Sequence, residues 1–228
     1  FTPVYPISKK PFIFIKKLNN HYMEESKNYP EPSGKFALDR LNALSDGVIA
    51  IALTLLVLGI DIPENHDFSA DGLKEFLIKL EPSLVAYISS FLIIAIYWIQ
   101  HHRIYQVLKF SNRVVLLFNI LFLFAITLLP FVSKIKALYR FDALVILIFA
   151  LAHIFTGLIL YATWKYVTKQ PELLISPIDN KLKSKLSLRL LVAPIICLFA
   201  IVIGFFNVDV ATYIFLLIPI LFAFMPKY

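Results

Sequence analysis

The stretch VVLLFNILFLFAITLLPFVS, residues 114–133, runs for 20 residues without a charge and decides the fold. About 20 helical residues are needed to span the roughly 30 Å of hydrocarbon in a bilayer. Only helices and closed barrels satisfy the backbone there, because no water is available to bond it. The run is too long and too uniformly apolar for a barrel strand, so it predicts a membrane-spanning α-helix.

Similar runs flank this one on both sides. Uncharged stretches cover residues 82–100, 143–164, 190–208 and 210–226, and a further stretch at about 38–60 is apolar from Val48 onward. The last two runs meet at Asn207–Val208–Asp209, where we expect a tight turn. The sequence therefore predicts an all-α integral membrane protein with six transmembrane helices per chain.

The composition agrees with a lipid environment. Hydrophobic residues make up 59% of the 228 residues and charged residues 16%, against about 25% charged in soluble domains. A soluble domain of this size could not bury so much apolar surface in one core. The lone cysteine, Cys197, cannot form an intrachain disulfide, and its surroundings have no zinc-ligand spacing. We expect it to be a small residue in the core or facing lipid.

The distribution of Lys and Arg predicts the orientation. With six spans both termini lie on one side, and 17 of the 22 basic residues fall on that side, with five on the other. Cytoplasmic loops carry such an excess, so we expect a multi-pass plasma-membrane protein with both termini in the cytoplasm. This asymmetry also explains the net charge of +7 without a nucleic-acid partner. The basic segment at 134–140, on the opposite side, is a local exception.

Two regions follow along the chain. Residues 1–35 carry charges and prolines at intervals, and we interpret them as a cytoplasmic N-terminal arm. Residues 36–228 contain all the predicted spans and form the six-helix transmembrane domain.

Polar residues lie near the cytoplasmic end of the first span, namely Arg40, Ser45 and Asp46. An ionisable residue within a span is costly and usually faces protein or water. We favour a structural anchor for Asp46 over a direct ion or proton site. Arg40 and Asp46 are six residues apart and lie on different helix faces, so a bridge through another helix is expected rather than a direct pair.

Other polar side chains are expected at the same depth. The second span returns to the cytoplasm, which brings Trp98, His101 and His102 to that level. The third span starts there, with Asn112 and then Asn119. Polar groups in a dry setting need partners, so we expect a polar cluster between the helices. The two histidines could instead be a metal pair or a pH switch. Adjacent histidines point about 100° apart on a helix, however, and no bound metal is expected.

An apolar stripe continues up the first span. Ile51, Leu55 and Leu58 follow the i, i+4, i+7 pattern, and Leu44 and Val48 extend it downward. From spacing alone, such a stripe indicates ordinary helix packing.

The first span also resembles a known signature. The run Arg40-x-x-x-Leu44-Ser45-Asp46-Gly47 is similar to the R-x-x-x-F-S-D motif of the transmembrane protein 175 potassium channels. Leu44 replaces the usual Phe. Residues Trp98-x-x-His101-His102-Arg103 in the second span support the likeness. The resemblance covers residues 36–226. It is to the prokaryotic branch of the family, whose members have one six-helix unit per chain.

The resemblance implies a potassium-selective channel, not an enzyme. It implies a homotetramer whose pore is lined by four copies of the first helix and narrowed by apolar side chains rather than a carbonyl filter. Carried onto this chain, the constriction is Ile51, Leu55 and Leu58, with Thr54 as a polar layer beside it. Potassium is then the permeant ion, and no cofactor is expected. Arg40, Ser45, Asp46, Trp98, His101, His102 and Asn112 form the structural polar network.

Two other classes of membrane protein, a transporter and an enzyme, fit the sequence less well than a channel. A secondary transporter of cations or small solutes usually shows broken helices and charges at mid-membrane. The predicted midplane is nearly free of charge, which argues against coupling. A membrane enzyme built on His101, His102 and Ser45 would need a nucleophile–base pattern that the sequence does not show.

Overall fold

The computed structural model describes residues 37–60, 70–139 and 142–225. The predicted N-terminal arm, the first connecting loop at 61–69, and residues 226–228 lie outside these ranges. The division of the chain at residue 35 therefore stays a prediction.

The described part of the chain is built from helices. Five long helices and a final pair of short ones follow one another, with two short 3-10 segments between them. In chain order they are α2 (Leu38–Leu55), η1 (Leu56–Gly59), α3 (Ala70–Gln106), α4 (Arg113–Leu138), α5 (Ala143–Val167), η2 (Pro171–Leu173), α6 (Asn180–Gly204), α7 (Val208–Ile214) and α8 (Leu217–Phe224).

Five of these elements are long and apolar enough to cross a membrane, and the sixth is shorter. The all-α membrane class predicted from the uncharged runs is confirmed. The sixth span differs from the others because its helix stops at Ile214 and restarts at Leu217. Pro219 explains the position of this break, since a proline ring clashes with the carbonyl four residues earlier, here that of Phe215.

Helix α3 is much longer than the run predicted at 82–100. Its 37 residues correspond to about 55 Å, well beyond the thickness of the hydrocarbon. The additional N-terminal part carries exposed charges, including an i,i+4 pair between Glu75 and Lys79 at 2.7 Å. The charges limited the predicted span, but an exposed helix outside the membrane tolerates them.

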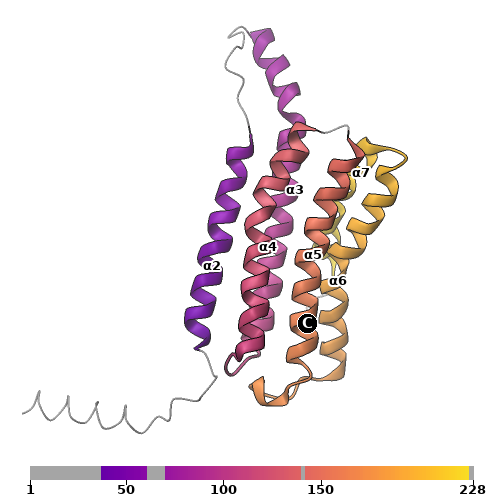
Figure 1. Ribbon diagram of the computed structural model, residues 1–228. Coiled ribbons are helices and arrows are strands. Elements are labelled where there is room, and N and C mark those ends of the chain that lie inside the picture. The colour runs from indigo at the N-terminus through magenta and orange to yellow at the C-terminus, as the bar shows by residue number, and fades with distance from the viewer. Residues whose placement is uncertain (1–36, 61–69, 140–141, 226–228) are drawn as a thin grey trace, which may run out of the picture. The chain divides into compact units, whose positions relative to one another are not determined.

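The long helices run alternately up and down and lie side by side (Figure 1). Helix α5 packs against α4 and α6, whereas α2 packs against α4 and α3. The backbones of α5 and α6 approach closely at Gly157, where an added Cβ would lie 2.8 Å from Cγ of Pro194.

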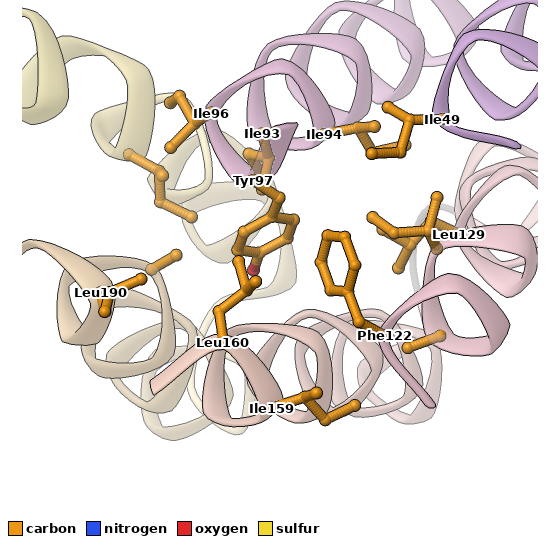
Figure 2. Close-up of a cluster of buried hydrophobic side chains, with 14 of the residues drawn as sticks. Ile49, Ile93, Ile94, Ile96, Tyr97, Phe122, Leu129, Ile159, Leu160 and Leu190 are labelled. Carbon is orange, nitrogen blue, oxygen red and sulfur yellow. The ribbon is translucent and has the colours of Figure 1, made fainter. Parts of the chain in front are cut away.

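One apolar core joins the described helices. Figure 2 shows Tyr97 of α3 in the middle of isoleucine, leucine and phenylalanine side chains from the surrounding helices. The Tyr97 hydroxyl donates a hydrogen bond of 2.8 Å to the backbone carbonyl of His153. This bond satisfies the one polar atom that a buried tyrosine brings into a core.

Candidate functional site: the first helix and its polar support

Helix α2 has two different faces. Leu41, Ser45, Ile49 and Ala52 are buried against the bundle. The opposite face is exposed, and α2 is the least buried of the five long helices. In Figure 1 this helix, coloured indigo, stands at the margin of the bundle. The chain therefore offers much of one face of its first helix to its surroundings.

The predicted pore-lining residues lie on that exposed face. Ile51 is 60% exposed and Leu58 is 68% exposed, with Leu55 and Thr54 between them. The helix tightens to 3-10 geometry from Leu56 onward. Residues three apart eclipse in that geometry, so Leu58 stays above Leu55.

Thr54 is the polar member of this face. Its Oγ1 donates a hydrogen bond of 2.8 Å to the backbone carbonyl of Ile51. The donor of the hydroxyl is thereby used within the helix, while its oxygen lone pairs remain open on the exposed side. An oxygen presented in this way can accept a hydrogen bond from water or contact a cation.

A buried polar cluster supports the other side of α2. Asn119 of α4 donates from Nδ2 to Oγ of Ser45 at 3.0 Å and accepts at Oδ1 from Nε2 of His101 at 2.7 Å. Ser45 also donates to the carbonyl of Leu41, one turn earlier in its own helix, at 2.8 Å. Three helices, α2, α3 and α4, are thus joined by one asparagine.

The ring of His101 is fixed by stacking as well as by its hydrogen bond. It lies between Tyr105, with centroids 4.1 Å apart, and Phe122, with centroids 5.1 Å apart, and both pairs are nearly parallel. Because Oδ1 of Asn119 can only accept, Nε2 of His101 carries the proton in this arrangement. The imidazole therefore acts as a packed donor inside the bundle.

A second, more exposed group of contacts involves Asp46 and His102, the residues that follow Ser45 and His101 in α2 and α3. Nε1 of Trp98 donates to Oδ1 of Asp46 at 2.8 Å, and the ring of Trp98 stacks on His102 with centroids 6.0 Å apart. His102 also shares a 2.9 Å hydrogen bond with Gln106. The two adjacent histidines thus belong to different groups, as their angular separation on a helix requires.

The remaining network residues lie apart from both groups. Asn112 caps the N-terminus of α4 by accepting from the backbone N–H of Val115 at 3.0 Å, and donates to the hydroxyl of Tyr166 at 2.9 Å. Arg40 is exposed and makes no hydrogen bond or ion pair with another residue of the described chain. The bridge that the sequence suggested between Arg40 and Asp46 is therefore not seen among the described residues.

Gln106 and Tyr166 were not among the predicted residues, whereas Asn119 was expected at this level. Gln106 bonds His102, and Tyr166 holds Asn112. Asn119, an amide inside an otherwise apolar run, is the partner of His101. Within the described ranges no set of three or more His, Cys, Asp or Glu side chains is placed to hold a metal ion.

The basic residues separate between the two ends of the bundle. Ten of the 14 described Lys and Arg residues lie at or near the end where α2 begins, and four at the end where it stops. One of those four, Lys136, is buried inside the bundle. Part of the exceptional basic segment at 134–140 is therefore not a loop charge.

Helices of this length and apolarity, arranged in one bundle, define a multi-pass α-helical membrane protein. The sequence profile described as the endosomal/lysosomal potassium channel TMEM175 matches residues 40–130. A potassium channel of Streptomyces collinus is 31% identical over 144 residues, which cover 61% of this chain and 69% of that relative. The chain belongs to the TMEM175 potassium channel family, which confirms the resemblance found in the first span.

Other relatives extend the match along the chain. A potassium channel of Chamaesiphon minutus is 28% identical over 187 residues, 81% of this chain and 92% of that protein. The crystal structure of a lysosomal potassium-selective TMEM175 homolog from that organism has a TM-score of 0.71 at 27% identity, covering 82% of this chain and 96% of that one. The endosomal/lysosomal proton channel TMEM175 of Gallus gallus is 25% identical over 196 residues, and the match spans only 38% of its length.

Proposed function

We propose that this chain forms a potassium-selective channel whose pore is lined by α2. Membership of a potassium channel family supports potassium as the permeant ion. The exposed face of α2 carries the proposal for the pore, because its large apolar side chains are left uncovered within one subunit. Four copies related by a central axis would turn that face into the wall of a pathway.

The composition of the face suits a narrow pore. Rings of Ile51, Leu55 and Leu58 would restrict the path and resist wetting, as apolar constrictions do. Potassium gives up its hydration shell more easily than sodium, so a passage that offers few oxygens penalises sodium more. The oxygens of Thr54 would partly replace the lost water.

The polar groups on the other faces of α2 would hold its angle. The Ser45–Asn119–His101 cluster fixes the depth and rotation of α2 against α3 and α4. The Trp98–Asp46 bond adds a second point of attachment one residue further on. We assign both groups a structural role, and we infer that Arg40, which is exposed, contacts a neighbouring subunit.

The orientation follows from the same asymmetry of charge. The end of the bundle at which α2 begins holds most of the described basic residues, and such ends face the cytoplasm. We therefore place both termini inside the cell and the chain in the plasma membrane.

A truncation experiment tests the pore. Ile51→Ala should raise potassium flux into proteoliposomes and weaken discrimination against sodium, because the side chain would no longer narrow the path. The purified assembly should keep its size, since Ile51 makes no contact with the core of its own subunit. Flux would be measured with potassium and with sodium at equal driving force.

Ile120→Ala is the matched control. Ile120 is an isoleucine of similar exposure, 52%, on α4, and it should leave flux and selectivity unchanged. An Ile51→Ala protein that loses stability but conducts normally per assembly would show that the face packs against another subunit or faces lipid. The pore would then have to be sought elsewhere.

A further inference from the structure

Lys136 is an unusual residue for the interior of a membrane bundle. It lies two residues before the end of α4, and only 2% of its surface is exposed. Its Nζ makes no hydrogen bond to any described residue, and no described carboxylate lies within ion-pair distance. A buried ammonium without compensation is costly, so its surroundings must stabilise it in another way.

Two aromatic rings surround the amine. Nζ lies 4.3 Å from the ring centroid of Phe149 and 4.5 Å from that of Phe215. The two rings meet edge to face at 4.7 Å, which fixes them relative to each other. Faces of aromatic rings attract cations, most strongly where water is excluded. Cation–π contacts with these two rings therefore take the place of the ion pair with a carboxylate that a buried lysine usually makes.

The three residues come from three helices. Lys136 belongs to α4 and Phe149 to α5, whereas Phe215 caps the C-terminus of α7 at the break in the last span. Helix α7 has only seven residues and needs a fixed point to stay in place. Phe215, which is fully buried, is such a point, and it is also the residue that contacts the ammonium.

Two other polar side chains lie near this cluster, and neither is a carboxylate. His153 of α5 lies against Phe149, with centroids 4.5 Å apart, and has no hydrogen-bond partner on either ring nitrogen among the described residues. Cys197 of α6 is buried as well. The packed elements therefore leave the two phenylalanine rings as the main stabilising contacts of the amine.

We propose that Lys136 is a cationic clamp that fastens the broken last span to the bundle through Phe149 and Phe215. Loss of its charge releases α7 and opens this end of the subunit, while α2 and its polar cluster stay in place. The clamp is independent of which ion the channel conducts.

The only cysteine of the chain is a natural reporter of this opening. Cys197 is fully buried in α6, the helix against which α7 packs. In the purified full-length protein, Lys136→Met should raise the rate at which Cys197 reacts with a maleimide about tenfold at fixed pH, equivalent to about 1.4 kcal/mol. Lys136→Arg, which retains a cation, should restore most of the protection. Equal rates in Lys136→Met and the unchanged protein would overturn the clamp.

Two further variants separate the clamp from simple packing. Lys134→Met removes a charge two residues away and should not change the rate. Phe215→Leu should raise it, and the double variant with Lys136→Met should react no faster than either single variant, because both remove the same contact. Rates that multiply in the double variant would show that the two residues act separately.

A direct comparison at residue 215 covers the case in which Lys136→Met does not fold. With Lys136 present, Phe215→Leu should expose Cys197 and Phe215→Tyr, which keeps the ring, should protect it. Equal exposure in both would contradict the role of the ring.

Discussion

Asn119 is the residue whose loss should most disturb the support of α2. In Asn119→Leu, Oγ of Ser45 keeps its bond to the carbonyl of Leu41 at 2.8 Å. Nε2 of His101 loses its hydrogen-bond partner among the described residues, and the residue is just 3% exposed. The change therefore costs one replaceable interaction and leaves one donor buried without an acceptor.

The two losses differ in size. Hydrogen bonds between membrane helices contribute about 0.6 kcal/mol on average, whereas a donor left buried and unpaired costs about 1–3 kcal/mol. Asn119→Leu should thus destabilise the protein by about 2–4 kcal/mol. Ser45→Ala keeps the bond between His101 and Asn119 but leaves Nδ2 of Asn119 buried without its acceptor, so it should cost about 1–3 kcal/mol.

Unfolding of the detergent-solubilised protein, followed by the fluorescence of its two tryptophans, would measure these differences. Thr127→Val is the control on α4, because Thr127 bonds only the carbonyl of Phe124 in its own helix. A rescue provides the strictest test. His101→Phe keeps the stacking and removes the orphaned nitrogen, so it should recover part of the stability lost in Asn119→Leu. A double variant less stable than Asn119→Leu would refute the reasoning.

Three other predictions concern packing, capping and orientation. Gly157→Ala should destabilise the protein by about 1–3 kcal/mol, seen as a lower midpoint of thermal unfolding, because its Cβ would meet Pro194 at 2.8 Å. Asn112→Ala should cost about 1–2 kcal/mol in the same assay, since it removes the cap of α4. A cysteine at Lys79 should react with an impermeant reagent added outside cells, and a cysteine at Ser184 should not.

Each of these has its own control. Gly47→Ala should be neutral or slightly stabilising in the isolated subunit, because no atom lies within 4 Å of its Cβ position. Tyr166→Phe should reproduce only the smaller part of the Asn112 effect, as it leaves the helix cap in place. The labelling needs a Cys197→Ala background, and reaction at Ser184 from outside would reverse the topology.

Much of the fold could be predicted because a bilayer imposes a simple rule on helix length and charge. The run at 114–133 became the centre of α4, and the run at 143–164 became α5 almost residue for residue. The exposed extension of α3 could not be found in the same way, since charges such as Glu75 and Lys79 are also typical of loops. In this part of α3 only the backbone hydrogen bonds seen in the structure distinguish a helix from a loop.

The candidate site shows a similar limit. The spacing of Ile51, Leu55 and Leu58 correctly placed them on one face, but spacing cannot distinguish a lipid-facing, packed or pore-lining face. The partnership of Ser45 with Asn119 depends on how α2 and α4 are rotated against each other, across 74 residues of sequence. The sequence predicts a loop position for Lys136, because its neighbours in the chain do not indicate that the rings of Phe149 and Phe215 lie beside it.

The isolated bridge between Leu108 and Leu174 has a consequence for the order of assembly during synthesis. It joins the turn between α3 and α4 to the segment between α5 and α6, through Lys109 N–H to the carbonyl of Leu173 at 2.7 Å and Ile175 N–H to the carbonyl of Val107 at 3.0 Å. These bonds cannot form before the ribosome has made the second segment. The α3–α4 hairpin thus enters the membrane with that turn unpaired, and the emergence of residues 173–175 locks the α3–α4 and α5–α6 hairpins into register.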